Sequence, residues 1–312
     1  MTPEELRRYL DERRLLVDEA LEQYLPQASD PPKEIHEAVR YSVFAGGKRL
    51  RPILILAATE AAGGQMEQAL GAAAAIEMIH TYSLIHDDLP AMDDDDYRRG
   101  RLTCHKVYGE AMAILAGDAL LTQAFILLSA ENPPCPPLAK GGWGDLKGVY
   151  DSEARLMVIR EIAEAAGSKG MVGGQVVDML QEDREIDLPT LTYLHEHKTG
   201  ALIRVCLRVG GILASAGSEQ MEALTRYGER IGLAFQIVDD ILDLEGSLEV
   251  LGKQAGSDLR KKKATFPALL GIEESRRWAH RLVSEAQEAV AVFGDRGVAL
   301  QAIAEFVVMR RG

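Results

Sequence analysis

Apolar residues recur every three or four positions along most of this chain, which is the pattern of amphipathic α-helices. The clearest stripe contains Ile76, Ile79, His80, Ser83, Leu84 and Asp87. Comparable stripes run through residues 104–130, 189–215 and 218–245, whereas the alternation typical of β-strands is scarce. The sequence therefore predicts an all-α fold.

Proline and glycine divide these stripes, because proline is tolerated at helix starts and glycine often follows helix ends. The prolines near expected starts are Pro3, Pro32 and Pro189, and the glycines near expected stops are Gly46, Gly47, Gly63, Gly64 and Gly246. This spacing predicts about ten or more helices.

A Pro- and Gly-rich segment at about residues 132–148 cannot be regular helix. At 312 residues the chain could form one or two domains, so the segment could be a linker. Two clusters of aspartates, at Asp87–Asp93 and Asp239–Asp243, lie on opposite sides of this segment in the sequence, and we expect them to act together. We therefore expect residues 1–312 to form a single domain with an irregular loop.

Composition restricts the partners of this protein. A net charge of -13 and a pI near 5.1 argue against nucleic acid and anionic membranes, which would be repelled. Cys104, Cys135 and Cys206 lack the spacing of a zinc site and are odd in number, which fits a reducing, cytoplasmic location. We find no secretory signal and no apolar run that suggests a membrane span.

The first aspartate cluster has six aspartates between positions 87 and 96. They would repel one another without bound cations, and their hard oxygens favour magnesium or calcium over zinc. On a straight helix Asp87 and Asp93 would lie about 240° apart. Pro90 removes a helical hydrogen bond between them, so a break that loops out two residues would return the pair to i,i+4 geometry. An acidic, solvated helix end is the alternative.

The second cluster places Asp239 and Asp243 one helical turn apart on the same face. Like charges at this spacing are destabilising without a partner. Because the flanking residues are apolar, we expect the carboxylates to enter a partly buried cavity.

Basic residues that could balance a phosphate are also present, since arginine binds phosphate oxygens with a planar fork and lysine binds as a point charge. They occur at Lys48, Arg51, Arg98, Arg99, Lys198, Lys253 and 261–263. Each is weak evidence by itself, and the combination with the aspartates suggests a diphosphate site.

Together these motifs resemble the trans-isoprenyl diphosphate synthases from about Ala45 to Leu270. The first cluster, Asp87-Asp88-Leu89-Pro90-Ala91-Met92-Asp93, is most similar to that of bacterial farnesyl diphosphate synthases (geranyltranstransferases). The resemblance implies a helical bundle of the isoprenoid synthase type around a central substrate cavity. It also implies a prenyltransferase that condenses isopentenyl diphosphate with dimethylallyl or geranyl diphosphate through a carbocation.

The resemblance also implies residue roles. Magnesium, three ions in this family, would be held by Asp87, Asp93 and Asp239, with Asp88, Asp240 and Asp243 as further ligands or partners. The allylic diphosphate would be held by Arg98, Lys198, Thr199, Gln236, Lys253 and Lys263. Isopentenyl diphosphate would occupy a metal-free pocket of Lys48, Arg51, His80 and Arg99. Which of Lys261, Lys262 and Lys263 contacts phosphate stays open.

Product length in this family depends on the residues before the first motif, here Tyr82 and Ser83. An aromatic residue at Tyr82 implies farnesyl diphosphate, and the alternative is geranylgeranyl diphosphate. Family members are usually homodimers, which we expect here.

Three other functions remain possible. A class I terpene cyclase shares the first motif, but its second motif mixes Asn, Ser or Thr with Glu, whereas Asp239-Asp240-Ile241-Leu242-Asp243 is wholly acidic at its polar positions. A metal phosphohydrolase would need further histidine ligands. A non-catalytic helical subunit would be expected to lose aspartates or basic residues, and this chain keeps both.

Overall fold

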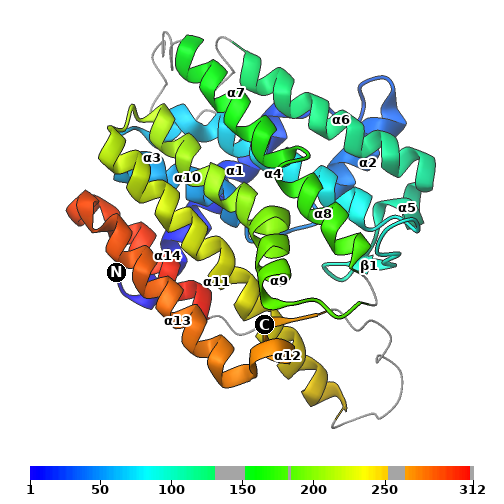
Figure 1. Ribbon diagram of the computed structural model, residues 1–312. Helices are drawn as coiled ribbons and strands as arrows, with labels where there is room; N and C mark the ends of the chain where they lie inside the picture. Colours follow the sequence, from blue (N-terminus) through cyan, green and yellow to red (C-terminus); the bar gives the residue numbers. More distant parts are fainter. Residues whose placement is uncertain (131–151, 182–183, 252–263, 310–312) are drawn as a thin grey trace. The chain divides into compact units, whose positions relative to one another are not determined.

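The computed structural model describes residues 1–130, 152–181, 184–251 and 264–309 of the chain, without the side chains of 246–251 (Figure 1). These residues are almost entirely helical, which confirms the predicted all-α fold. They divide into two compact units. One unit comprises Arg7–Leu56 and Gly64–Ile159, and the other comprises Met1–Leu6, Ala57–Gly63 and Arg160–Gly312. The prediction of a single domain stays a prediction.

The first unit, hereafter the Asp87 unit, contains most of the N-terminal elements. They are α1 (Pro3–Tyr24), α2 (Lys33–Val43), α3 (Leu50–Ala61), α4 (Met66–Asp87), β1 (Tyr97–Arg98), β2 (Arg101–Leu102), α5 (Cys104–Tyr108) and α6 (Glu110–Ser129). Three helices, α1, α3 and α7 (Ser152–Ala166), contribute residues to both units.

At the centre of the Asp87 unit, α4 packs against α6 and α2. Its residues Ala72–Ala75 are fully or almost fully buried, and Ile76, Met78 and Ile79 are fully buried. A helix that is apolar on all sides is expected to lie in a core, and α4 fits that expectation. The burial of α4 fixes the position of Asp87 at its C-terminal end.

The other unit, hereafter the Asp239 unit, contains the remaining elements. They are α8 (Met171–Leu180), α9 (Leu188–His195), the π-helix η1 (Glu196–Gly200), α10 (Ala201–Leu213), α11 (Ser218–Leu251), α12 (Phe266–Leu270), α13 (Ile272–Ala289), the 3₁₀-helix η2 (Val290–Gly297) and α14 (Val298–Met309).

The long helix α11 is central to this unit and packs against α10, α13 and α14 (Figure 1). Tyr227 of α11 is fully buried and donates a hydrogen bond of 2.7 Å to the carbonyl oxygen of Leu300. Our prediction that a helix stops at Gly246 is wrong, because α11 continues to Leu251. Glycine costs only about 1 kcal/mol in a helix interior, which neighbouring residues can offset.

Most other predicted helix boundaries agree with the structure. Pro32 is the N-cap residue of α2, Pro189 lies in the first turn of α9, and Pro3 begins α1. The pairs Gly46–Gly47 and Gly63–Gly64 follow the ends of α2 and α3. The predicted loop at 132–148 lies outside the described residues.

Candidate active site

The loop after α4 brings Asp87 and Asp93 together through their backbones. The helix ends at Asp87, and the N–H of Asp93 donates a hydrogen bond of 2.8 Å to the carbonyl oxygen of Asp87. Within the loop, the N–H groups of Met92 and Asp94 donate to the carbonyl oxygen of Leu89. The predicted helix break is therefore present, but the helix does not resume after it. A closed turn, instead of i,i+4 spacing, joins the two aspartates.

Asp88 differs from Asp87 and Asp93 because its carboxylate is already paired. It is buried, and Arg98 Nε donates to its Oδ1 at 2.6 Å. Burial raises the pKa of Asp88, and the bond from Arg98 opposes that rise. The structure thus places a predicted metal ligand and a predicted phosphate ligand in one ion pair.

Arg98 and Arg99 lie in a short β-hairpin whose two strands are each two residues long. Strands β1 and β2 pair Arg98 with Arg101, and the turn between them has positive φ at Arg99 and Gly100 (53° and 75°). Such a turn suits the right-handed twist of the strands. The hairpin was not predicted, because two-residue strands are too short to show an alternating pattern.

The predicted metal-free pocket contains a cluster of cations around His80. Arg51 Nη1 lies 3.2 Å from His80 Nε2, and Arg99 donates to the carbonyl oxygen of Gly46. Burial, followed by the charges of Arg51 and Arg99, lowers the pKa of His80 well below its usual value. His80 is therefore neutral and can accept from Arg51, and Lys48, three residues before Arg51 in the chain, is exposed. This concentration of positive charge suits an anion.

Arg49 organises the segment between Lys48 and Arg51, and sequence reasoning missed it. Its guanidinium is buried and donates to Asp18 at 2.8 Å, to Glu77 at 2.7 Å and to the carbonyl oxygen of Val43 at 2.7 Å. Its φ of +50° is unusual for a residue with a side chain. The sequence did contain one indication of this role: Glu77 is an acidic residue within the apolar α4 and requires a basic partner.

The second cluster lies on α11 of the Asp239 unit, where Asp239 and Asp240 are half-buried and Asp243 is exposed. Asp240 Oδ2 accepts the N–H of Phe266 at 2.9 Å. The pKa of Asp240 is raised to about 7, mainly by burial. The bond from Phe266 lowers it, and the charges of Asp243 and Asp239 raise it further. Of the two carboxylates expected to be partly buried, Asp239 is half-buried and Asp243 is exposed.

The π-helix η1 carries Lys198 and Thr199. Lys198 Nζ lies 2.5 Å from Asp178 Oδ2 on α8. Gly174 allows α8 to approach η1 closely, since a Cβ at this position would lie 2.2 Å from the backbone nitrogen of Lys198. Asp178 was not predicted, although it follows Gly174 by one helical turn.

Gln236 is half-buried on α11 and connects η1 with the second cluster. Its Oε1 lies 3.1 Å from His195 Nδ1, and its Nε2 donates to Asp239 Oδ2 at 3.4 Å. The other predicted phosphate ligands, Lys253 and Lys263, lie outside the described residues, as do Lys261 and Lys262.

The two residues expected to control product length lie on α4 one turn before the cluster. Tyr82 is buried, with its ring edge-on to His86 at 5.7 Å between centroids. His86 Nε2 lies 3.0 Å from the carbonyl oxygen of Ile114, and a Cβ at Gly117 would collide with it. Ser83 Oγ instead donates to the carbonyl oxygen of His80 at 2.8 Å.

The carboxylates of the two clusters are suited to bind magnesium together with the phosphates of a substrate. Within the described ranges, no three His, Cys, Asp or Glu side chains form a group that could hold a metal by themselves. Magnesium is commonly bound by one or two carboxylates together with waters and substrate phosphates. The donor set of hard oxygens in both units suits that arrangement.

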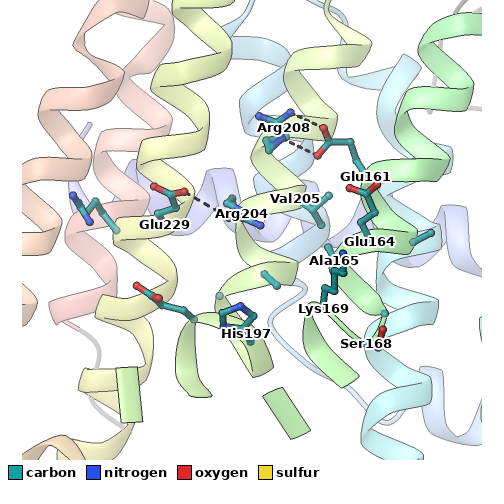
Figure 2. Close-up of a pocket in the computed structure, with 17 residues that line it drawn as sticks. Glu161, Glu164, Ala165, Ser168, Lys169, His197, Arg204, Val205, Arg208 and Glu229 are labelled. Atoms are coloured by element: carbon teal, nitrogen blue, oxygen red, sulfur yellow. Dashed lines mark hydrogen bonds and ion pairs between the residues drawn. The ribbon is translucent and has the colours of Figure 1, made fainter. Parts of the chain in front are cut away.

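A cavity of about 700 Å³ lies elsewhere in the Asp239 unit, between α7, η1, α10 and α11 (Figure 2). In its wall Arg208 pairs with Glu161 at 2.5 Å and Arg204 with Glu229 at 3.6 Å (Figure 2). Its described lining includes none of the cluster aspartates. Because acidic and basic side chains compensate each other there, the cavity has no evident preference for a diphosphate.

Comparison with known proteins places these motifs in context. Residues 32–294 match the family described as polyprenyl synthetase. The chain is 46% identical to a geranylgeranyl diphosphate synthase of Cyanophora paradoxa, with 97% of this chain and 95% of that protein covered. It is 44% identical to a farnesyl diphosphate synthase of Bacillus subtilis, with 94% and 92% covered. The crystal structure of an FPP/GFPP synthase from Zymomonas mobilis superposes with a TM-score of 0.84 at 38% identity, covering 97% of this chain and 99% of that one.

Proposed function

Because the chain belongs to the polyprenyl synthetase family and is a trans-prenyltransferase, we propose that it condenses isopentenyl diphosphate head-to-tail with dimethylallyl and then geranyl diphosphate. The product that we propose is farnesyl diphosphate. Geranylgeranyl diphosphate is the second candidate, because relatives of both kinds share similar identity with this chain.

One observation in the Asp87 unit carries the proposal. The loop closed between Asp87 and Asp93 is rich in carboxylates, whereas the segment around neutral His80 is rich in arginines. The first suits a diphosphate bound through divalent cations, and the second suits a diphosphate bound directly. A reaction with two different diphosphate substrates requires two such unlike sites.

The allylic substrate must lose its diphosphate, so stabilising negative charge on that leaving group lowers the barrier most. Bound magnesium, three ions by analogy with the family, would supply part of this stabilisation. Asp87, Asp93 and Asp239 would hold the metal, with Asp88, Asp240 and Asp243 as further ligands or partners.

Protein cations would supply the rest. Arg98, Lys198, Thr199 and Gln236, together with Lys253 and Lys263, would bind oxygens of the allylic diphosphate directly. For Lys198 this means exchanging its partner Asp178 for the substrate. Both the bond that is lost and the bond that is gained are charge-assisted, so Lys198 keeps a strong anionic partner throughout the exchange.

Isopentenyl diphosphate would be held by Lys48, Arg51, His80 and Arg99 while its double bond attacks the allylic carbocation. Loss of a proton then completes the condensation. The departing diphosphate is the base that we propose, since it carries acceptor oxygens next to the new bond.

The farnesyl product rests on Tyr82. Its ring is large and buried, and His86 lies against its edge. Such a ring would stop a growing isoprenoid chain early, and a smaller side chain would allow a longer product.

We further propose that the protein is a cytoplasmic homodimer that does not span a membrane. On α6, Ile114, Leu115 and Ile126 are exposed although apolar, which suits a protein contact. Within the described part of the chain, α6 also has the length and composition of a membrane span, and one of its faces packs against α4 and α2.

The test is incubation of purified protein with labelled isopentenyl diphosphate and either dimethylallyl or geranyl diphosphate, with magnesium or with EDTA. We expect farnesyl diphosphate in the magnesium samples alone. A cyclic hydrocarbon would indicate a terpene cyclase, and a geranylgeranyl product would support the second candidate. Turnover only after addition of another family member would indicate a non-catalytic subunit.

A further inference from the structure

His195 lies where three elements of the Asp239 unit meet. It is the last residue of α9 and immediately precedes η1, and its side chain is only 11% exposed. Its ring stacks on Phe266 of α12, with 5.3 Å between centroids and 30° between planes. Both ring nitrogens face α11, Nδ1 toward Gln236 and Nε2 toward Asp240.

The first nitrogen determines how Gln236 is oriented. His195 Nδ1 lies 3.1 Å from Gln236 Oε1, and because an amide oxygen only accepts, Nδ1 must donate. This bond directs the amide nitrogen of Gln236 to the other side, where it donates to Asp239 Oδ2 at 3.4 Å. A rotated amide would face Nδ1–H with its own N–H groups. The tautomer of His195 therefore fixes which end of Gln236 faces Asp239.

The second nitrogen faces Asp240. His195 Nε2 lies 3.8 Å from Asp240 Oδ2, the oxygen that also accepts the N–H of Phe266 at 2.9 Å. This nitrogen is buried and has no hydrogen-bond partner within the described residues. A buried polar atom without a partner costs free energy that an apolar ring at this position would not cost. Packing alone therefore does not explain a histidine here.

His195 also adjoins the backbone that carries Lys198 and Thr199. The π-helix begins at the next residue, and π-helical turns inside α-helices are frequent at functional sites. Through its hydrogen bond to Gln236 of α11 and its stacking on Phe266 of α12, the imidazole holds the start of that turn against these two helices.

We propose that His195 is a positioning residue that orients Gln236, and through it Asp239 of the second aspartate cluster, for the allylic diphosphate and its divalent cations. The inference rests on the proposed function, and it adds a residue to which no role in the site has been given. His195 acts through its hydrogen bond to Gln236 and does not itself bind the substrate.

The test compares variants that separate the shape of the ring from its hydrogen bonds. His195→Phe keeps an aromatic ring that can stack on Phe266 but removes both nitrogens. His195→Asn keeps a donor near the position of Nδ1, and His195→Leu has nearly the size of Asn without a donor. If His195→Phe does not fold, the Asn and Leu variants make the same comparison at equal size.

Binding of inorganic pyrophosphate with MgCl₂, followed as an increase in the thermal unfolding temperature, gives a measurement that is independent of turnover. We expect His195→Phe and His195→Leu to bind about tenfold more weakly, the effect of one lost hydrogen bond, and His195→Asn to recover most of the affinity. The KM for geranyl diphosphate should rise similarly, while the KM for isopentenyl diphosphate stays unchanged.

Two results would overturn the inference: wild-type affinity for magnesium pyrophosphate in His195→Phe or His195→Leu, or equal weakening in the Asn and Leu variants. An equal rise of both KM values would also overturn it, because that result indicates a general structural role. If the wild-type protein neither binds magnesium pyrophosphate nor converts isopentenyl and geranyl diphosphate, the proposed function is wrong, and the inference about His195 is then wrong as well.

Discussion

The guanidinium of Arg49 and the carboxylate of Glu77 form an ion pair of 2.7 Å in which both side chains are almost completely buried. Asp18 and the carbonyl oxygen of Val43 accept the remaining hydrogen bonds of Arg49. This pair joins the segment that carries Lys48 and Arg51 to α4, which carries His80.

Removing Glu77 should therefore destabilise the fold strongly. We expect Glu77→Ala to lower the free energy of unfolding by about 3–5 kcal/mol, because the charge of Arg49 would stay buried without its closest partner. Urea denaturation measures this change. The matched control is Glu37→Ala, which removes an exposed pair with Lys33 and should cost at most about 0.5 kcal/mol. Similar losses in both variants would contradict the importance of burial.

Neutralising the first aspartate of either cluster should strongly reduce turnover without unfolding the protein. We expect Asp87→Asn and Asp239→Asn to lower kcat at least about 100-fold, the scale of losing one electrostatic group at a reacting centre. Asp94→Asn is the control, because Asp94 is exposed in the same loop and was given no role. An equal loss in the control would mean that only the total charge of the loop matters.

Truncating Tyr82 should change the product and not the reaction. Tyr82→Ala removes a buried ring on α4, just before the first cluster in the sequence. We therefore expect geranylgeranyl diphosphate or longer products to replace farnesyl diphosphate. Chromatography of dephosphorylated products measures the ratio. Tyr97→Ala removes an exposed ring from β1 and should leave the product unchanged. An unaltered ratio in Tyr82→Ala would remove this residue from the control of chain length.

The neutral state of His80 should make stability depend on pH. Its pKa is depressed in the folded protein, so below about pH 6.5 the unfolded chain binds a proton that the folded chain does not. Stability should therefore fall as the pH falls, by at most about 1.4 kcal/mol per pH unit from this group. His195, whose pKa burial lowers to about 4, should act in the same direction.

The variant His80→Gln removes the titration of His80 while keeping a polar partner for Arg51. Its free energy of unfolding should fall less steeply than that of the wild type between pH 7 and pH 5. Parallel pH profiles for the two proteins would show that His80 does not contribute.

Adding a methyl group at Gly174 should separate α8 from η1. The new Cβ would lie 2.2 Å from the backbone nitrogen of Lys198, and overpacking of this kind typically costs about 1–3 kcal/mol. We also expect a higher KM for geranyl diphosphate, because Lys198 would be displaced. Gly217→Ala is the control, since a Cβ at that position would have no neighbouring atom within 4 Å among the described residues. Equal changes in the two variants would contradict the close approach at Gly174.

Features that depend on local sequence were the ones predicted correctly. The helical period identified α4, α10 and α11. Pro90 indicated a break after Asp87, but the expected return to i,i+4 geometry was wrong, because the helix ends there and a closed turn follows. Gly246 was misinterpreted because its intrinsic cost is small enough for the rest of a long helix to offset.

Features that depend on contacts between distant residues could not be predicted. Arg98 was expected to bind phosphate, but nothing in its surroundings in the sequence indicates that it pairs with Asp88, ten residues earlier. Likewise, Arg49 resembles its neighbours Lys48 and Arg51 in the sequence. Only its buried ion pair with Glu77 shows that Arg49 stabilises the fold, whereas the other two were expected to bind phosphate.

The hydrogen bond between the N–H of Asp93 and the carbonyl oxygen of Asp87 is formed by backbone atoms alone. It therefore depends on how many residues separate the two aspartates and only weakly on which residues these are. A deletion between them would bring a different residue to the carbonyl and rotate the Asp93 side chain away, whereas most substitutions would leave the ring closed. The length of this segment therefore constrains the loop more tightly than its composition does.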